Sequence, residues 1–595
     1  MLSASDGINL ISVGTASRGE VPIDTGTRPL DLTDDFETFG EIELLDGTSL
    51  STSNNGGSRI VIRGGQLLVD RSLMTSINAG NIDSLQAGID IAVTGSLRLT
   101  NGSVVVSAAR RAGSGGSISV TAHDIFIEHG SSIATFGLGT GSAGDVRVHA
   151  DASVTVQASE GNELSTGIFS YAGFDSEAGV IEVRADRFVM NGGVIGTSPN
   201  VEPSQRPRSG NVEIVVGHLM LTDGARIDSS TESNFAGGTI TVQADTASLT
   251  GESVITAGTT GAGDAGDIHI DVDRLTLQDG SEITSDSQGE GDAGLIQITA
   301  DEMRMSDSLV TTSAQQANGG NIVIESGRLH LQNSFITATV NEQQGEGGNI
   351  DINADLMVLE DSEITSESRG TGDAGMIEIT ANEIRLLNST VTTNAQQANG
   401  GNIVIKSSLL RLHHSAITAT VNEQQGAGGN IDINSELVVL ENSEIIARAS
   451  EGRGGNIDIV AKALLADADT VIDASSDKGI NGTVNIDSII DLNENVNPLP
   501  RRFAEPNLLL KEPCAEHLRG GQVSSFVLSG RAGIPAEPSS GLPSLMVDIP
   551  ESASEEKEAD SAAHLPPSQA KAGAPQAWRQ ASLAYDCQHT AGSVQ

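Results

Sequence analysis

The chain has 595 residues, of which 69 are glycine and only 2% are aromatic, and its net charge is −46. A compact core normally uses large aromatic side chains to fill its volume, so this composition argues against a set of ordinary globular domains. A hydrophobic fraction of 37% is too high for a wholly disordered chain. The charge excludes a surface that binds nucleic acid or anionic membrane, because like charges repel. The composition favours an elongated fold with a narrow core of small and β-branched side chains.

Residues 1–40 are predicted to form an N-terminal cap or junction. Their start, MLSASDGINLISVG, has neither the basic segment nor the apolar segment of a signal peptide, so no export signal is visible there. No stretch of the chain approaches the ~18 uninterrupted apolar residues of a membrane-spanning helix. We therefore expect no membrane span.

Residues 41–490 are predicted to form a repeat array. A phrase of a small residue, glycine, any residue and then Ile-x-Ile or Ile-x-Val recurs from Thr239 to Asn456 at an interval of about 27 residues. Within 291–450 the similarity is closer, because SAQQANGGNIVI at 313 returns as NAQQANGGNIVI at 394, an offset of 394 − 313 = 81 residues. The 81-residue unit is a tandem duplication of three shorter repeats. So regular a period is typical of a solenoid.

Each short repeat contains two alternating apolar and polar segments, such as 349–353 and 356–360, and then a third short run, such as 335–339. Alternation with period two indicates half-buried strands. A polar pair of an Asn or Asp followed by Gly or Ser separates the second and third segments, and such pairs form turns. The predicted turn residues are Asp279, Gly280, Asn333, Ser334, Asp361, Ser362, Asn388 and Asn442.

The pattern predicts an all-β protein, a parallel β-helix with coils of ~27 residues and three short strands in each coil. Successive coils would then stack at ~4.8 Å. No proline lies between Pro207 and Pro498, as an uninterrupted ladder of strands requires. The segment 184–210 interrupts the period and is predicted to leave the rod as a loop.

Residues 491–595 are rich in Pro, Ala and Ser and are predicted to form a largely irregular tail. The tail contains the only two cysteines, Cys514 and Cys587. A disulfide between them would close a loop of 587 − 514 = 73 residues and would stabilise the fold by about 4 kcal/mol. The alternative is two unpaired thiols, and both states stay open.

No catalytic or cofactor-binding residue is predicted. A glycosidase needs paired carboxylates at a fixed separation, and the one Asp-Asp pair, Asp34-Asp35, precedes the array without a nearby His or Lys. The carboxylates of the array obey the repeat, whereas a catalytic site would break it. The pair His413-His414 is read as part of a surface turn. Gly-Asp phrases such as 261–267 are read as tight turns, with weak calcium association as the alternative.

Three segments resemble one family. The repeat GGNIDIxADxLxLxxSxIxT, the opening GINLISVGTASRGEV (7–21) and the element CAEHLRGGQVSSFVLSGRAGIP (514–535) resemble the filamentous-haemagglutinin-like exoproteins of two-partner secretion, especially those of cyanobacteria. The resemblance covers about residues 7–540, and Ala532 stands where the family pattern has glycine. The residues that match the C-terminal motif are Ser524, Ser525, Phe526, Gly530, Arg531, Gly533 and Pro535.

The resemblance implies a right-handed β-helix that leaves the cell through an outer-membrane two-partner secretion transporter. It further implies an adhesin, extracellular or at the cell surface, that binds glycans or other cells through many weak contacts. Some related adhesins stay tethered through a cysteine-bearing C-terminus, which Cys514 and Cys587 match. The family's secretion domain and signal peptide do not precede Met1 in this sequence.

Two other functions are retained as alternatives. One is a polysaccharide lyase or hydrolase, which predicts carboxylates clustered on neighbouring coils near 184–210. The other is a passive surface-layer component that associates with itself.

Overall fold

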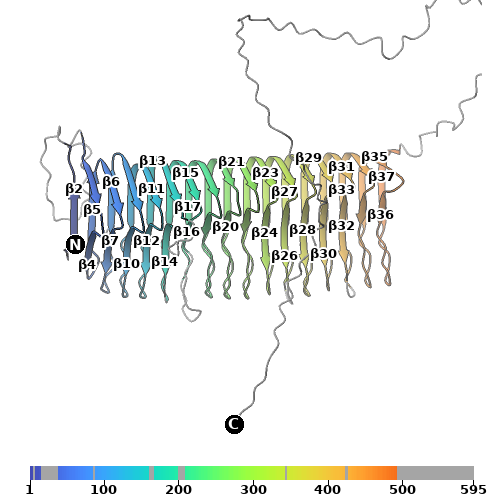
Figure 1. Ribbon diagram of the computed structural model, residues 1–595. Helices are drawn as coiled ribbons and strands as arrows, with labels where there is room; N and C mark the ends of the chain where they lie inside the picture. The colour runs from blue at the N-terminus through green and yellow to red at the C-terminus, as the bar shows by residue number, and fades with distance from the viewer. Residues whose placement is uncertain are drawn as a thin grey trace, which may run out of the picture. The chain divides into compact units, whose positions relative to one another are not determined.

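The computed structural model describes residues 1–4, 7–14, 38–84, 88–159, 166–173, 175–197, 208–341, 345–422 and 426–491. These residues form a parallel β-helix, and every pairing between its named strands is parallel, as in β21 (Ile268–Gln278) with β23 (Ile296–Ser306). The predicted β-helical fold is confirmed. Figure 1 shows the coils stacked in sequence order along one axis, from blue at the N-terminus to orange at β37 (Val484–Asp491). The predicted irregular tail from residue 492 onward, with both cysteines, lies outside the described residues.

One side of the rod is a sheet of 17 short strands within the described residues, one strand from each coil. Each of these strands has three to six residues. The strands of this sheet are β1 (Leu2–Ala4), β4 (Ser49–Asn54), β7 (Leu73–Asn78), β10 (Val104–Ala109), β12 (Ser132–Gly137), β14 (Gly167–Ala172), β16 (Val194–Gly196), β18 (Arg226–Asp228), β20 (Val254–Thr256), β22 (Glu282–Thr284), β24 (Leu309–Ala314), β26 (Phe335–Val340), β28 (Glu363–Ser368), β30 (Thr390–Ala395), β32 (Ala416–Val421), β34 (Glu444–Ile446) and β36 (Val471–Asp473).

The other two sides are formed, from β11 onward, by longer strands that bend at a corner, and in the first coils by two separate short strands. The strand β11 shows this arrangement, because its first half pairs with β8 and its second half with β9. The strands of these two sides are β2 (Gly7–Ile11), β3 (Glu41–Leu44), β5 (Arg59–Gly64), β6 (Gln66–Asp70), β8 (Ile89–Val93), β9 (Ser96–Thr100), β11 (Ile118–Glu128), β13 (Val146–Gln157), β15 (Ile181–Asn191), β17 (Val212–Thr222), β19 (Ile240–Leu249), β21, β23, β25 (Ile322–Gln332), β27 (Ile350–Glu360), β29 (Ile377–Leu387), β31 (Ile403–His413), β33 (Ile431–Glu441), β35 (Ile457–Ala466) and β37.

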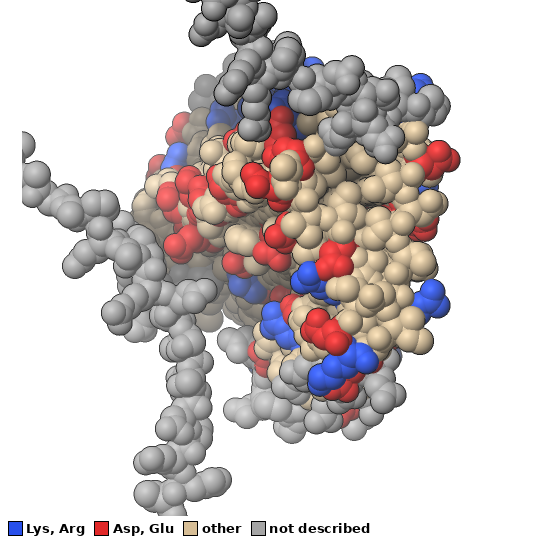
Figure 2. Space-filling view, turned by 90° about the vertical axis from the view of Figure 1, so that its right-hand side faces the viewer, with Lys and Arg blue, Asp and Glu red and all other residues tan. Residues whose placement is uncertain are grey.

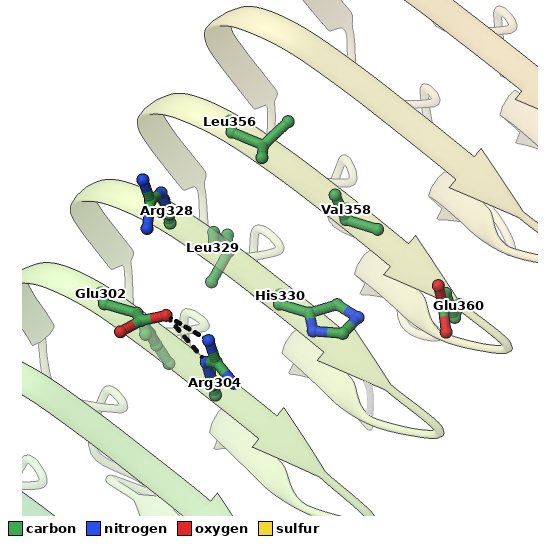
Figure 3. A pocket seen from close by; sticks show the side chains of 9 residues that line it. Glu302, Arg304, Arg328, Leu329, His330, Leu356, Val358 and Glu360 are labelled. Atoms are coloured by element: carbon green, nitrogen blue, oxygen red, sulfur yellow. Dashed lines mark hydrogen bonds and ion pairs between the residues drawn. The ribbon is translucent and has the colours of Figure 1, made fainter. Parts of the chain in front are cut away.

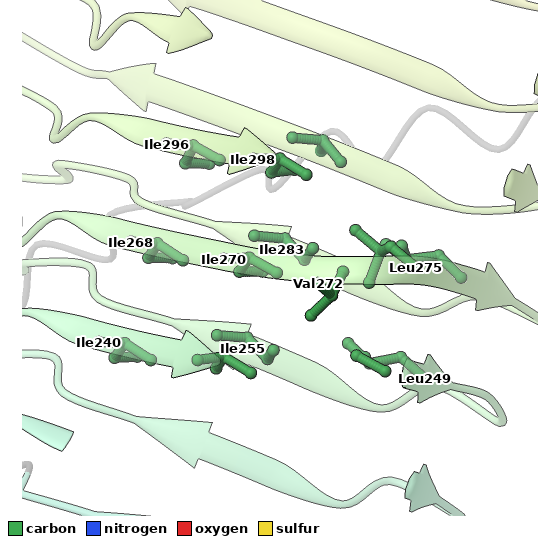
Figure 4. Close-up of a cluster of buried hydrophobic side chains, with 14 of the residues drawn as sticks. Ile240, Leu249, Ile255, Ile268, Ile270, Val272, Leu275, Ile283, Ile296 and Ile298 are labelled. Atoms are coloured by element: carbon green, nitrogen blue, oxygen red, sulfur yellow. The ribbon is translucent and has the colours of Figure 1, made fainter. Parts of the chain in front are cut away.

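The core is a set of apolar columns that run along the rod. Ile240, Ile268 and Ile296 lie in register on successive coils, 28 residues apart, and each has 0% exposure. Figure 4 shows these side chains stacked above one another, with Ile255 and Ile283 facing them from the short strands. Each fully buried aliphatic side chain contributes about 1.5–3 kcal/mol relative to exposure. The columns therefore replace the aromatic side chains that the composition lacks.

One inward column is polar and joins the short strands to a line of glycines. The hydroxyl of Ser285 donates to the carbonyl oxygen of Gly266 at 2.6 Å, and that of Thr312 donates to Gly320 at 2.7 Å. A Cβ on Gly348 would lie 1.8 Å from the carbonyl oxygen of Gly320. Glycine is required there because the backbones of successive coils meet too closely for any side chain.

The structure differs from the sequence prediction at three places. The two alternating segments of a repeat form one bent strand, as in β27, because ladder pairing resumes directly after the corner residue. The solenoid begins before residue 41, since β1 and β2 already pair with β4 and β5. The segment predicted to leave the rod at residue 184 does not leave it there, because β15 and β16 continue the rod through Gly196.

The inward columns end at the last described coil. Val484 and Ile486 of β37 pair in register with the buried Ile457 and Ile459, yet they are 44% and 43% exposed. Figure 2, which faces this end of the rod, shows a broad area without charged side chains beside scattered acidic and basic groups.

Candidate functional site

A groove follows the corner at which the long strands bend. The corner residue of each coil is left out of the ladder, as Asp245 and Asp273 are between β19 and β21. In the middle of the rod these positions line a hollow of about 760 Å³, here called the corner groove. Its lining residues come from six successive coils and are Asp245, Thr246, Asp273, Arg274, Asp301, Glu302, Gly327, Arg328, Asp355, Leu356, Asn382 and Glu383.

The corner groove is acidic and open to solvent. Asp245, Asp273, Asp301 and Asp355 are all exposed, and the first three lie on consecutive coils. Strands in one sheet are separated by ~4.8 Å, so the groove repeats a carboxylate at that interval. Repulsion between such charges is limited by solvent. The arrangement offers a ligand the same polar contact at each coil.

Two arginines partly neutralise the groove. Glu302 accepts hydrogen bonds from Arg304 on its own strand, at 2.6 Å, and from Arg274 on the preceding coil, at 2.9 Å. The hydrogen bond from Arg304 is the main cause of a lowered pKa at Glu302, which is therefore ionised at neutral pH. Both arginines are largely exposed, so these ion pairs position side chains more than they stabilise the fold.

A smaller hollow of about 230 Å³ adjoins the groove and shares Glu302, Arg328 and Leu356 with it. Figure 3 shows Arg328 and His330 projecting from β25, with Leu356 and Val358 on the next coil. Among the residues that the structure describes, no carboxylate lies within ion-pair distance of Arg328. Arg328 is thus an exposed cation that remains available to an external anion or hydroxyl group.

This hollow departs from the internal repeat. The residues 81 positions after Gly327, Arg328 and His330 are Ser408, Leu409 and Arg411, although Glu302 and Arg304 return as Glu383 and Arg385. The second copy therefore lacks the gap left by Gly327 and the cation at Arg328. The sequence analysis missed these residues because it used only the features that the two copies share. A comparison of the two copies position by position would have found them.

A second polar groove, of about 540 Å³, lies over the glycine line. The carboxylate of Asp264 accepts the backbone N–H of Asp292 at 2.9 Å, and Asp292 accepts that of Asn318 at 2.9 Å. Asp267 likewise accepts the N–H of Leu295 at 2.9 Å. The Gly-Asp phrases thus hold successive coils together. Over the described parts of the chain, no group of three or more His, Cys, Asp or Glu is placed to hold a metal ion.

Asp286 is the carboxyl group whose surroundings change its proton affinity most clearly. It follows β22, and its Oδ1 accepts the backbone N–H of Ser313 at 2.7 Å. Burial raises the pKa of Asp286 to about 6, and the hydrogen bond from Ser313 opposes this rise. Asp286 therefore joins two successive coils and lines neither groove.

The structure places the predicted turn residues at one edge of the rod and outside the grooves. All of the Asp and Asn members have left-handed backbone, with φ between 46° and 54°, and Gly280 has φ 76°. The serines that follow cap the turn, as Ser334 does by donating to the carbonyl of Gln332 at 2.7 Å. His414 occupies the same left-handed position, and its ring contacts that of His413. The predicted Asp and Asn turn residues with left-handed backbone are Asp279, Asn333, Asp361, Asn388 and Asn442.

Several predicted features lie outside the described residues. These are Asp34-Asp35, a disulfide between Cys514 and Cys587, and the C-terminal motif at 524–535. No helix long and apolar enough to cross a membrane is found in the part of the chain that the structure describes.

Comparison with protein-family models, with curated proteins and with solved structures yields no match. The class of protein therefore rests on the fold, which is that of a repetitive parallel β-helix.

Proposed function

We propose that this chain is an adhesin-like structural rod, secreted or displayed at a cell surface, that attaches to glycans or other cells along its corner groove. The observation that carries the proposal is the continuity of the groove over six coils, with an exposed carboxylate at most of them. A long shallow groove fits an extended polymer better than a small molecule, which would bind in an enclosed pocket.

Weak contacts suffice for such attachment. Each exposed polar or charged contact contributes little alone, but contacts repeated along one rigid rod act together, because the first raises the effective concentration of the rest. Export through an outer-membrane two-partner secretion transporter belongs to the same proposal. Its support is the likeness of the repeat and of residues 514–535 to exoproteins of that pathway.

The test compares the native chain with a groove variant, Asp245→Asn, Asp273→Asn and Asp301→Asn together. Retention on immobilised glycans and on intact cells is measured, and we expect the variant to lose about tenfold in apparent affinity. The control is Asp271→Asn, which removes an exposed carboxylate of β21 outside the groove. Failure of the native chain to bind any glycan or cell would overturn the proposal.

A polysaccharide-cleaving enzyme is the second candidate, because carboxylates do lie on neighbouring coils of one groove. The carboxylates of the corner groove begin at Asp245, whereas the sequence predicts such a cluster near residues 184–210. This candidate predicts new reducing ends or unsaturated products from polyuronates, and their absence over a broad panel would dismiss it. Sedimentation with and without calcium tests the third reading, a self-associating surface layer.

A further inference from the structure

On the outer face of the 17-stranded sheet, five neighbouring strands in the N-terminal half of the rod have no charged side chain. On β7, β10, β12, β14 and β16, every outward side chain is uncharged, and we name these positions the uncharged face. Beyond it, the outward positions begin with the ion pair of Arg226 and Asp228 on β18 and continue with Glu282 on β22. Figure 1 shows the strands of the uncharged face side by side in the N-terminal half of the rod. A chain of net charge −46 thus keeps one contiguous surface without charge.

The centre of the uncharged face is a group of three aromatic rings. Phe136 and Tyr171 lie in register on β12 and β14, with ring centroids 5.6 Å apart. Phe169 stacks on Tyr171 at 5.2 Å with an interplanar angle of 15°. Only 2% of the chain is aromatic, so three rings on two adjacent strands are a marked concentration.

The three rings differ in how far they are buried. A Cβ on Gly167 would lie 1.7 Å from the carbonyl oxygen of Val194 and 3.2 Å from the tip of the Phe169 ring, so glycine is required where β14 and β16 approach each other beside this ring. Phe169 is 4% exposed and supports Tyr171 from the side, whereas Phe136 and Tyr171 remain partly exposed. Buried Phe169 therefore fixes the orientation of a ring that meets solvent.

Polar groups border the rings on one side. Asp228 is held by Arg226 at 2.9 Å and by the backbone N–H of Ser230 at 2.8 Å. Burial, and secondarily the charge of Asp228, raise the pKa of Tyr171, so its hydroxyl keeps its proton and can donate. Flat rings beside fixed hydrogen-bonding groups are the combination that binds an amphipathic ligand.

We propose that the uncharged face binds a neutral, β-linked polysaccharide, with the C–H faces of successive pyranose units stacked on Phe136 and Tyr171. The absence of charge disfavours a polyuronate or another ionic polymer, whereas the alignment of the two rings along the rod suits a chain of sugar units. The proposal rests on the proposed attachment to glycans, but it assigns a surface that is separate from the corner groove.

The test uses amorphous cellulose and chitin as neutral probes and polygalacturonate as the charged one. The double variant Phe136→Ala and Tyr171→Ala is expected to bind the neutral probes about tenfold more weakly, because it removes both of the rings on which the sugar units would stack. The matched control is Phe335→Ala, which removes a ring that is 42% exposed on the same sheet outside the uncharged face. The variant Tyr171→Phe keeps the ring and should retain most of the binding.

The outcomes separate the two proposals. Neutral-probe binding that is lost in the double variant and kept in the groove variant supports the assignment. Equal binding by the double variant and the native chain overturns it while leaving attachment through the groove intact. If the double variant instead abolishes self-association in sedimentation and leaves cellulose binding unchanged, the face joins copies of the chain and the assignment is wrong. Circular dichroism of each variant checks that the β-helix is retained.

Discussion

Single side chains shape the turns, join neighbouring coils and set how the rod responds to pH. The left-handed Asx residues end the long strands, and the carboxylates of residues such as Asp264 fasten one coil to the next. These roles were readable from the sequence, since Asn and Asp tolerate φ > 0 and bond backbone groups. The pKa of Asp286 was not readable, because it depends on burial between coils that only the folded chain produces.

Asp286 makes the rod less stable as pH rises. Its folded pKa of about 6 exceeds the unfolded value of 3.8, so the folded state binds the proton more tightly. The resulting stabilisation is complete below pH ~4 and is lost as the pH rises through about 6, by roughly 3 kcal/mol. Asp286→Asn removes this loss while keeping an acceptor for the N–H of Ser313. We expect its unfolding midpoint to exceed that of the native chain at pH 7.5.

Unfolding midpoints at pH 4.5 and 7.5 check the prediction, with Asp271→Asn as the control for removal of one exposed negative charge. A variant whose midpoint falls in parallel with the native chain between these pH values would show that Asp286 is not the group responsible.

At the scale of a strand, the inward and outward positions have separate tasks. Ile268 of β21 is fully buried between Ile240 and Ile296, whereas Thr276 of the same strand faces outward. Ile268→Ala leaves a cavity that neighbouring coils cannot fill, so we expect a loss of about 2–5 kcal/mol. This loss of stability is measured by hydrogen exchange, as faster exchange of the backbone amides of β19, β21 and β23.

Thr276→Ala is the matched control on β21 and should change local stability by less than about 0.5 kcal/mol. Equal effects of the two substitutions would mean that the apolar columns do not carry the stability of the coil.

The strands also show what the sequence pattern could and could not reveal. Alternation located both halves of β27 as two separate segments, although the ladder resumes directly after Asp355, the exposed corner residue between them. The strands β1 and β2 were missed because residues 15–37 separate them from β3 and break the period. The hollow at Gly327 and Arg328 was missed because it arises where one copy departs from the other.

At the scale of the molecule, the internal duplication predicts that whole coils can be removed. Deletion of residues 291–371 takes out 81 residues and joins Glu290 to Gly372, the counterpart of Gly291. The remaining strands keep their register, so we expect a folded rod shorter by three coils, or about 14 Å. Small-angle scattering measures the change in length.

Deletion of residues 291–330 is the control, because its 40 residues are not a whole number of coils. It should expose apolar columns and cause aggregation. A folded, soluble product from this second deletion would contradict the register that the structure assigns.

The parallel ladders have a mechanical consequence. Their hydrogen bonds lie along the rod, so a force that pulls its two ends apart loads one coil at a time. When a coil of 28 residues peels away, the rod shortens by ~4.8 Å while the released chain reaches about 95 Å at full extension. A rod built in this way lengthens in discrete steps under load. Each step lowers the force on the contacts by which the two ends of the rod are attached.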